Sequence, residues 1–150
     1  MDLLPHGKEL DLVILKAHLL IEEQINLLVA ERLKNPDVIL DEERFESHYR
    51  IRLAQSFFPI DFQPWLWHAL RQLNRLRNRV AHSLSPKGLN DIAEDVIRAV
   101  PGELSPPDAA LQYRLEIALW SLFDAVSELV ETRKATVQVI RPPNPEQNSG

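Results

Sequence analysis

Four cationic or titratable side chains gather in the stretch LNRLRNRVAHSLSP, residues 73–86. They are Arg75, Arg77, Arg79 and His82, and no carboxylate lies near them in the sequence. The planar guanidinium of arginine binds phosphate through two parallel hydrogen bonds, and histidine takes up or releases a proton near neutral pH. The combination is typical of a site that holds an anion and moves protons around it.

The distribution of charge sets this stretch apart from the rest of the chain. The protein has a net charge of −5, yet residues 62–90 hold four arginines, one lysine and no acid. An acidic body disfavours non-specific coating of nucleic acid, because such binding depends on neutralising many phosphates. The pattern therefore predicts a local anion site within a body that repels anions.

Length and composition restrict the class of protein further. A chain of 150 residues suits one domain, and the lack of cysteine excludes disulfides, thiolate metal sites and thiol catalysis. The N-terminal stretch resembles neither a signal peptide nor a membrane span, so we expect a cytoplasmic protein without a membrane partner. Glycine-rich phosphate loops, nucleophilic triads and metal-ligand clusters are not visible, and we expect neither a cofactor nor a metal.

The elements that must position the cationic stretch are predicted to be helices. Apolar residues recur at three- and four-residue spacing, and there are only 4 glycines. We expect an all-α, up-and-down bundle of about five helices, closed by the first and last of them. The expected helices cover residues 8–34, 41–57, 64–85, 91–100 and 105–134. Residues 1–134 would form the domain and residues 135–150 a flexible C-terminal tail.

On a helical wheel, the segment that begins at Pro64 has two different faces. Leucines such as Leu66, Leu73 and Leu76 form the face that should enter the core. The opposite face is a polar strip that comprises Arg71, Arg75, Asn78 and His82, with Arg79 beside it. Arg77 lies on the shoulder of the apolar face, where its stem packs on the bundle or its guanidinium looks into a cleft.

The string Arg77-Asn78-Arg79-Val80-Ala81-His82 resembles the R-x(4-6)-H signature of HEPN domains, all-helical units of RNA-cleaving toxins and defence proteins. With the segment EIALWSLFDAVSELV, it looks most similar to the branch grouped with the mannitol-operon repressor family. The resemblance covers about residues 8–134. It implies a homodimer that cleaves RNA without a metal, where two copies of the motif face each other.

The same resemblance implies roles for individual residues. His82 would be the general base or acid, Arg77 would stabilise the charge of the transition state, and Asn78 would orient either the histidine or a phosphate oxygen. Arg71, Arg75 and Arg79 would bind the RNA backbone.

The spacing of Arg77 and His82 leaves the geometry open. Five residues along a straight helix place them about 140° apart, so they cannot face one pocket from a single turn. Either the helix ends before His82, or a partner subunit supplies one of the two residues, or Arg75 is the catalytic arginine instead of Arg77. Arg75 lies within about 20° of His82 on the wheel and is the second choice to Arg77.

Other polar and aromatic residues have structural explanations. His6, His18, His48 and His68 are predicted to make surface or interhelical hydrogen bonds, since none shows the spacing of a helical metal site. The tryptophans are predicted to pack in the core or at an interface.

Two other functions use the same residues. One is a non-catalytic dimeric regulatory or interaction module, in which His82 closes a helix and Arg77 bridges subunits. The other is a toxin that shares the nuclease chemistry and is neutralised by an antitoxin.

Overall fold

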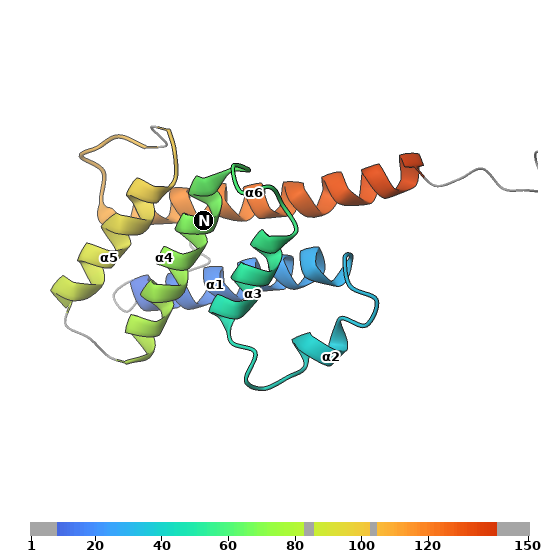
Figure 1. The fold of residues 1–150 in the computed structure, drawn as a ribbon. Helices are drawn as coiled ribbons and strands as arrows, with labels where there is room; N and C mark the ends of the chain where they lie inside the picture. Colours follow the sequence, from blue (N-terminus) through green and yellow to red (C-terminus); the bar gives the residue numbers. More distant parts are fainter. Residues whose placement is uncertain (1–8, 83–85, 103–104, 141–150) are drawn as a thin grey trace, which may run out of the picture.

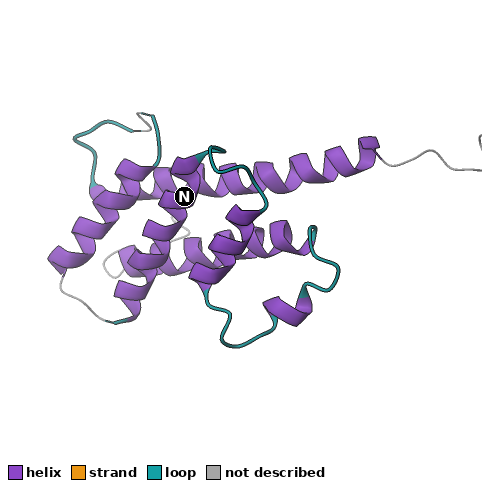
Figure 2. Ribbon diagram, in the orientation of Figure 1, coloured by secondary structure: helices purple, strands orange, loops and turns teal. Residues whose placement is uncertain are grey.

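The computed structural model describes residues 9–82, 86–102 and 105–140, and every regular element in this part of the chain is a helix (Figure 2). The predicted all-α bundle is confirmed. Its helices are α1 (Glu9–Ala30), α2 (Asp37–Leu40), α3 (Ser47–Ser56), α4 (Pro64–Ala81), α5 (Pro86–Ala99) and α6 (Leu111–Ile140).

The first and last long helices lie side by side, and the middle helices cross them (Figure 1). Helices α1 and α6 run in the same direction, whereas α3, α4 and α5 alternate in direction from one to the next. Helix α4 packs on α1, α3 and α5, so it is the central element of the crossing layer. Within the described ranges, no helix is both long enough and apolar enough to span a membrane.

Helix α4 follows the prediction closely because proline marks its start. Pro64 occupies the first turn, where its missing N–H costs no hydrogen bond. The helix ends at Ala81, with His82 as the C-cap residue. Helix α5 then starts at Pro86 and not near Asp91, because proline suits the first turn of a helix, where its missing N–H costs no hydrogen bond.

The expected helix over residues 41–57 is wrong at its N-terminal end. The acidic residues Asp41, Glu42 and Glu43 lie in the connection between α2 and α3. Arg50 holds this connection from α3, since its guanidinium donates to the carbonyl oxygens of Leu40 at 2.8 Å and Phe45 at 3.1 Å. A backbone whose carbonyls bind an arginine side chain no longer needs to be helical.

The last helix starts later and ends later than expected. Pro106 and Pro107 lie in a turn, closed by a hydrogen bond from the Ala109 N–H to the Pro106 carbonyl at 3.0 Å, and α6 begins at Leu111. The backbone of α6 continues through Ile140, past the expected boundary at residue 134. Residues 141–150 of the predicted tail lie outside the described residues.

The core lies between the two layers and agrees with the helical wheel of α4. Leu66, Leu70, Leu73 and Leu76 are buried there together with Trp67, whose indole N–H donates to the Phe62 carbonyl at 3.1 Å. Facing side chains come from the remaining helices, among them Ile14, Leu28, Val96, Leu115 and Leu122. Burying one side of α4 in this way fixes its opposite side in solvent.

Candidate anion-binding site

The outer face of α4 is a strip of solvent-exposed polar side chains. Arg71, Arg75, Asn78, Arg79 and the C-cap residue His82 are all exposed, whereas the leucines of the same helix are buried. The helical wheel therefore placed the cationic strip correctly. Exposed guanidinium groups on one face remain free to meet a ligand from solution.

The strip borders a hollow of about 560 Å³, a size within the ~300–1,000 Å³ range of ligand sites. Its lining comes from α4 and from the start of α3, and consists of His48, Arg71, Asn74, Arg75, Asn78, Arg79 and His82. None of these residues is acidic. The hollow combines three guanidinium groups, two imidazoles and two amides, which is a suitable set for binding phosphate.

The arginines of the hollow are only weakly engaged by other parts of the protein. Arg71 donates to the Gln55 side-chain oxygen at 2.9 Å, and Nη1 of Arg75 lies 3.9 Å from Oδ2 of Asp95. Asp95 is shared with Arg98, which binds its other carboxylate oxygen. The Arg79 guanidinium forms no hydrogen bond or ion pair with the described part of the chain. The positive charge of the hollow is therefore largely uncompensated.

The end of α4 brings His82 to the hollow. Its backbone N–H donates to the carbonyls of Asn78 at 3.2 Å and Arg79 at 3.3 Å, which closes the last turn. The side chain remains exposed and shares the hollow with Arg75 and Asn78. The helix thus ends before His82, which was one of the three geometries left open by the spacing.

Arg77 is exposed but does not line this hollow. Its guanidinium donates to the Asn78 side-chain oxygen at a long 3.4 Å, and its charge acts on His18 of α1. Arg77 is therefore separate from the residues that line the hollow, as its shoulder position on the wheel indicates. Of the two candidate arginines, Arg75 is the one that shares a cavity with His82.

A half-buried histidine of α1, His18, lies behind the hollow. The His18 ring donates from Nε2 to the side-chain oxygen of Asn74 at 3.3 Å, and Asn74 itself lines the hollow. Burial lowers the pKa of His18 below its ordinary value of 6.5. Nearby Glu22 and the hydrogen bond to Asn74 oppose this effect, and Arg77 adds to it. His18 makes the interhelical hydrogen bond that was predicted for it.

The N-terminal turn of α3 is fixed to α1 by polar contacts on both sides of His48. Ser47 donates its hydroxyl proton to Oε2 of Glu22 at 2.5 Å, and Arg50 donates to the side-chain oxygen of Asn26 at 2.8 Å. Arg50 therefore braces the fold and does not extend the cationic surface. These contacts hold the backbone that carries His48 beside α4.

His48 is the site residue that sequence reasoning missed. It was assigned a surface or interhelical role, since α3 and α4 are separate in sequence and nothing indicated that they meet beside His82. Among the other histidines, His68 is exposed on α4 away from the hollow, and His6 lies outside the described residues. In the described ranges, no group of three or more His, Asp or Glu side chains is arranged to hold a metal.

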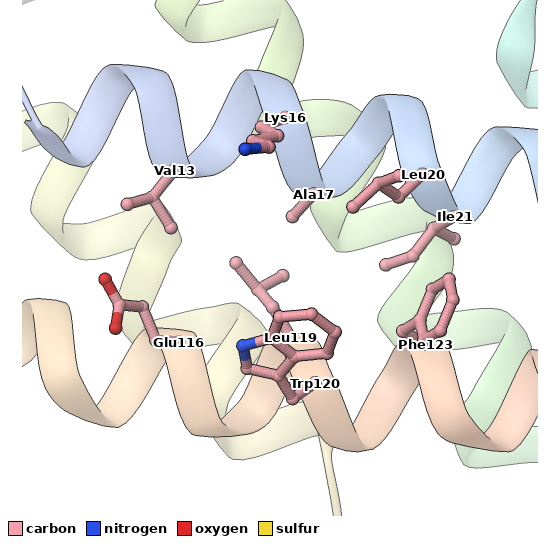
Figure 3. A pocket seen from close by; sticks show the side chains of 9 residues that line it. All are labelled: Val13, Lys16, Ala17, Leu20, Ile21, Glu116, Leu119, Trp120 and Phe123. Atoms are coloured by element: carbon pink, nitrogen blue, oxygen red, sulfur yellow. The ribbon is translucent and has the colours of Figure 1, made fainter. Parts of the chain in front are cut away.

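A second hollow, apolar and smaller, lies between α1 and α6. It has a volume of about 130 Å³, and Figure 3 shows Val13, Ala17 and Ile21 of α1 directed towards Leu119 and Phe123 of α6. Large apolar side chains are exposed on the same two helices: Leu12, Leu15, Leu19, Leu27, Tyr113 and Trp120. Trp120 is thus not a core residue, and its interface role stays a prediction.

Comparison of this chain with models of protein families, with curated proteins and with solved structures finds no match. The function is therefore inferred from the residues of the hollow and their geometry.

Proposed function

We propose that the protein binds single-stranded RNA in the hollow beside α4 and cleaves it without a metal, in the manner of a HEPN-type endoribonuclease. One observation carries the proposal: two histidines and three arginines line one open hollow that contains no carboxylate. Arginines meet the phosphates, and histidines supply the proton transfers that cleavage next to a 2′-hydroxyl requires. The lack of cysteine suits an activity in the reducing cytoplasm.

The residues of the hollow divide between binding and chemistry. Arg71 and Arg79 bind the backbone phosphates on either side of the reacting one. His82 exchanges a proton with the reacting oxygens, and Asn78 donates a hydrogen bond from its amide. The guanidinium that stabilises the phosphorane is assigned to Arg75, because it shares the hollow with His82. The assignment of this role to Arg77, which the family resemblance implies, stays a prediction that variants can test.

The decisive assay incubates the purified protein with end-labelled single-stranded RNA in the presence of a chelator. We expect cleavage of RNA but only binding of DNA of the same sequence, since DNA lacks the 2′-hydroxyl nucleophile. His82→Ala should abolish cleavage, and His68→Ala is the matched control because His68 is exposed on α4 outside the hollow. Cleavage that survives His82→Ala would remove His82 from the mechanism.

A parallel pair of variants decides which arginine works. Arg75→Ala should lower the cleavage rate by about a hundredfold, the loss expected when a preorganised charge-stabilising group is removed. Arg77→Ala should retain most of the activity, because Arg77 does not line the hollow. The opposite ranking would restore Arg77 as the catalytic arginine.

The apolar hollow between α1 and α6 supports a second proposal, a homodimer formed by two copies of this face. Trp120 lines the hollow and is 59% exposed, and a contiguous exposed apolar surface is typical of an interaction site. Lys16 and Glu116 border the hollow, so a two-fold arrangement can pair the lysine of one copy with the glutamate of the other.

A homodimer is also compatible with the alternative function, a non-catalytic regulatory module, so dimerisation by itself does not distinguish the two. RNA binding without cleavage by the wild-type protein would favour that module. RNA cleavage that stops when an antitoxin covers the cationic hollow would identify a toxin.

A further inference from the structure

The hollow holds a second histidine that no motif includes, and it reaches the hollow from a different helix. His48 is the second residue of α3, whereas His82 caps α4, and both line the same cavity. Cleavage of RNA by its own 2′-hydroxyl needs two proton transfers, one at the attacking oxygen and one at the leaving oxygen. One imidazole can make only one of them in a single concerted step.

We propose that His48 and His82 of one chain form the acid–base pair of the proposed ribonuclease, an inference that rests on RNA cleavage in this hollow. The 2′-oxygen attacks phosphorus while one imidazole accepts its proton. The bond between phosphorus and the 5′-oxygen breaks, and the other imidazolium gives its proton to that oxygen. The products are a 2′,3′-cyclic phosphate and a 5′-hydroxyl, and the two imidazoles have exchanged protonation states.

The surroundings of His48 suit this role. Its Nδ1 lies 3.5 Å from Oε2 of Glu46, and a carboxylate beside one ring nitrogen leaves the other nitrogen available to substrate. The charged groups that line the hollow with it are Arg71, Arg75, Arg79 and His82, all supplied by α4. The contacts of Ser47 and Arg50 with α1 hold the turn in place on either side of it.

A single chain then supplies both proton-transfer groups. A dimer is not needed to complete the acid–base pair, because α3 contributes what a second copy of the α4 motif would otherwise supply. The proposed site therefore differs from an active site that is formed between two subunits.

The first test measures single-turnover cleavage by His48→Ala and His82→Ala against the His68→Ala control. Both hollow variants should lose at least about a hundredfold in rate while RNA binding changes little. Far-ultraviolet circular dichroism and thermal melting show whether each variant is folded, and His48→Gln keeps the test valid if His48→Ala is not. A folded His48 variant with wild-type activity would contradict the acid–base pair but not the ribonuclease activity. A wild-type protein that does not cleave RNA would contradict both proposals.

The second test identifies the acid through an RNA in which sulfur replaces the 5′-bridging oxygen. A thiolate leaves without being protonated, so the variant that lacks the general acid should recover nearly wild-type rates on this substrate. Recovery by one of the two histidine variants supports the pair. Recovery by neither overturns it.

The third test asks whether the two histidines work in one chain. His48→Ala and His82→Ala proteins are unfolded together, refolded together and assayed as mixed oligomers. The mixture should stay inactive, since every hollow lacks one of its imidazoles. Restored activity would show that the histidines act across a subunit boundary and would overturn the single-chain site.

Discussion

The hollow beside α4 and the hollow between α1 and α6 have opposite chemical characters within one small domain. The first is lined by arginine, histidine and asparagine, and the second mostly by aliphatic and aromatic side chains. A cationic surface remains hydrated until a phosphate replaces its water, while an exposed apolar surface is stabilised by covering it. If both proposals hold, RNA binding and subunit association use separate elements, the first α3 and α4 and the second α1 and α6.

Reversing the charge of the α4 hollow should have the largest effect. Arg71→Glu, Arg75→Glu and Arg79→Glu together should weaken RNA binding by about a thousandfold or more, since each charged hydrogen bond contributes roughly tenfold. The dependence of log Kd on log salt should also become flatter by about 0.7 per lost phosphate contact. Filter binding at several salt concentrations measures both quantities.

The matched control carries the same change of charge elsewhere. Lys34, Arg44 and Arg52 are exposed and lie outside the hollow, so their triple change to glutamate should weaken binding far less. Equal losses in the two triple variants would mean that net charge and not the hollow binds RNA.

The next largest effect is expected at the apolar face. Trp120→Glu places a charge in the lining of the α1 and α6 hollow, where two copies of this face should meet, and two-fold symmetry repeats the change. The dimer dissociation constant should rise by about a hundredfold, in line with a loss of at least ~2 kcal/mol at a central interface residue. Sedimentation velocity over a range of concentrations measures it.

Ile60 provides the control for that variant. It is 94% exposed but lies in the connection between α3 and α4, so Ile60→Glu should leave the dimer unchanged. A wild-type protein that is monomeric at high concentration would contradict the proposed interface.

A smaller effect concerns stability and pH. Because the folded pKa of His18 lies below 6.5, the unfolded chain binds a proton that the folded chain does not, so stability falls as pH drops below about 6.5. The charged side chains around His18 whose interactions also contribute to this titration are Glu22, Arg50 and Arg77. His18→Leu should flatten the dependence of unfolding free energy on pH between about 6.5 and 5.

The same variant should also lower the free energy of unfolding by about 1 kcal/mol at neutral pH, because the Asn74 side chain loses its hydrogen bond with the His18 ring. Urea denaturation at several pH values measures both effects. An unchanged slope in the His18 variant would assign the titration to other groups.

The smallest effect is expected from Asp95→Asn. The ion pair with Arg75 is exposed and 3.9 Å long, so the free energy of unfolding should change by less than about 0.5 kcal/mol. RNA binding should tighten by up to about threefold, because Arg75 no longer has a competing carboxylate. Weaker RNA binding in this variant would mean that Asp95 positions Arg75 for its ligand.

The sequence predicted those features that depend on local periodicity. Proline at residue 64 and the leucine spacing defined α4, its buried face and the exposed strip with Arg71, Arg75 and His82. The helix wheel also separated Arg77 from that strip, and Arg77 is absent from the lining of the hollow in the structure.

Features that depend on tertiary contacts were not predictable in this way. The connection before α3 is held by Arg50, whose partners are backbone carbonyls that any sequence would offer. His48 joined the site only because α3 packs against α4, a contact that no spacing within either segment encodes. The expected start of the last helix failed because Pro106 and Pro107 close a turn there.

The pairing of α1 with α6 also has a consequence for biosynthesis. A ribosome releases α1 first and α6 last, and Val13 and Ile21 can meet Leu119 and Phe123 only after nearly the whole domain has emerged. Until then, α1 can pack on α3 and α4, but its side that faces α6 stays uncovered in the nascent chain. Premature termination within α6 would leave that side of α1 permanently uncovered, and the destabilised product would be more susceptible to proteolysis.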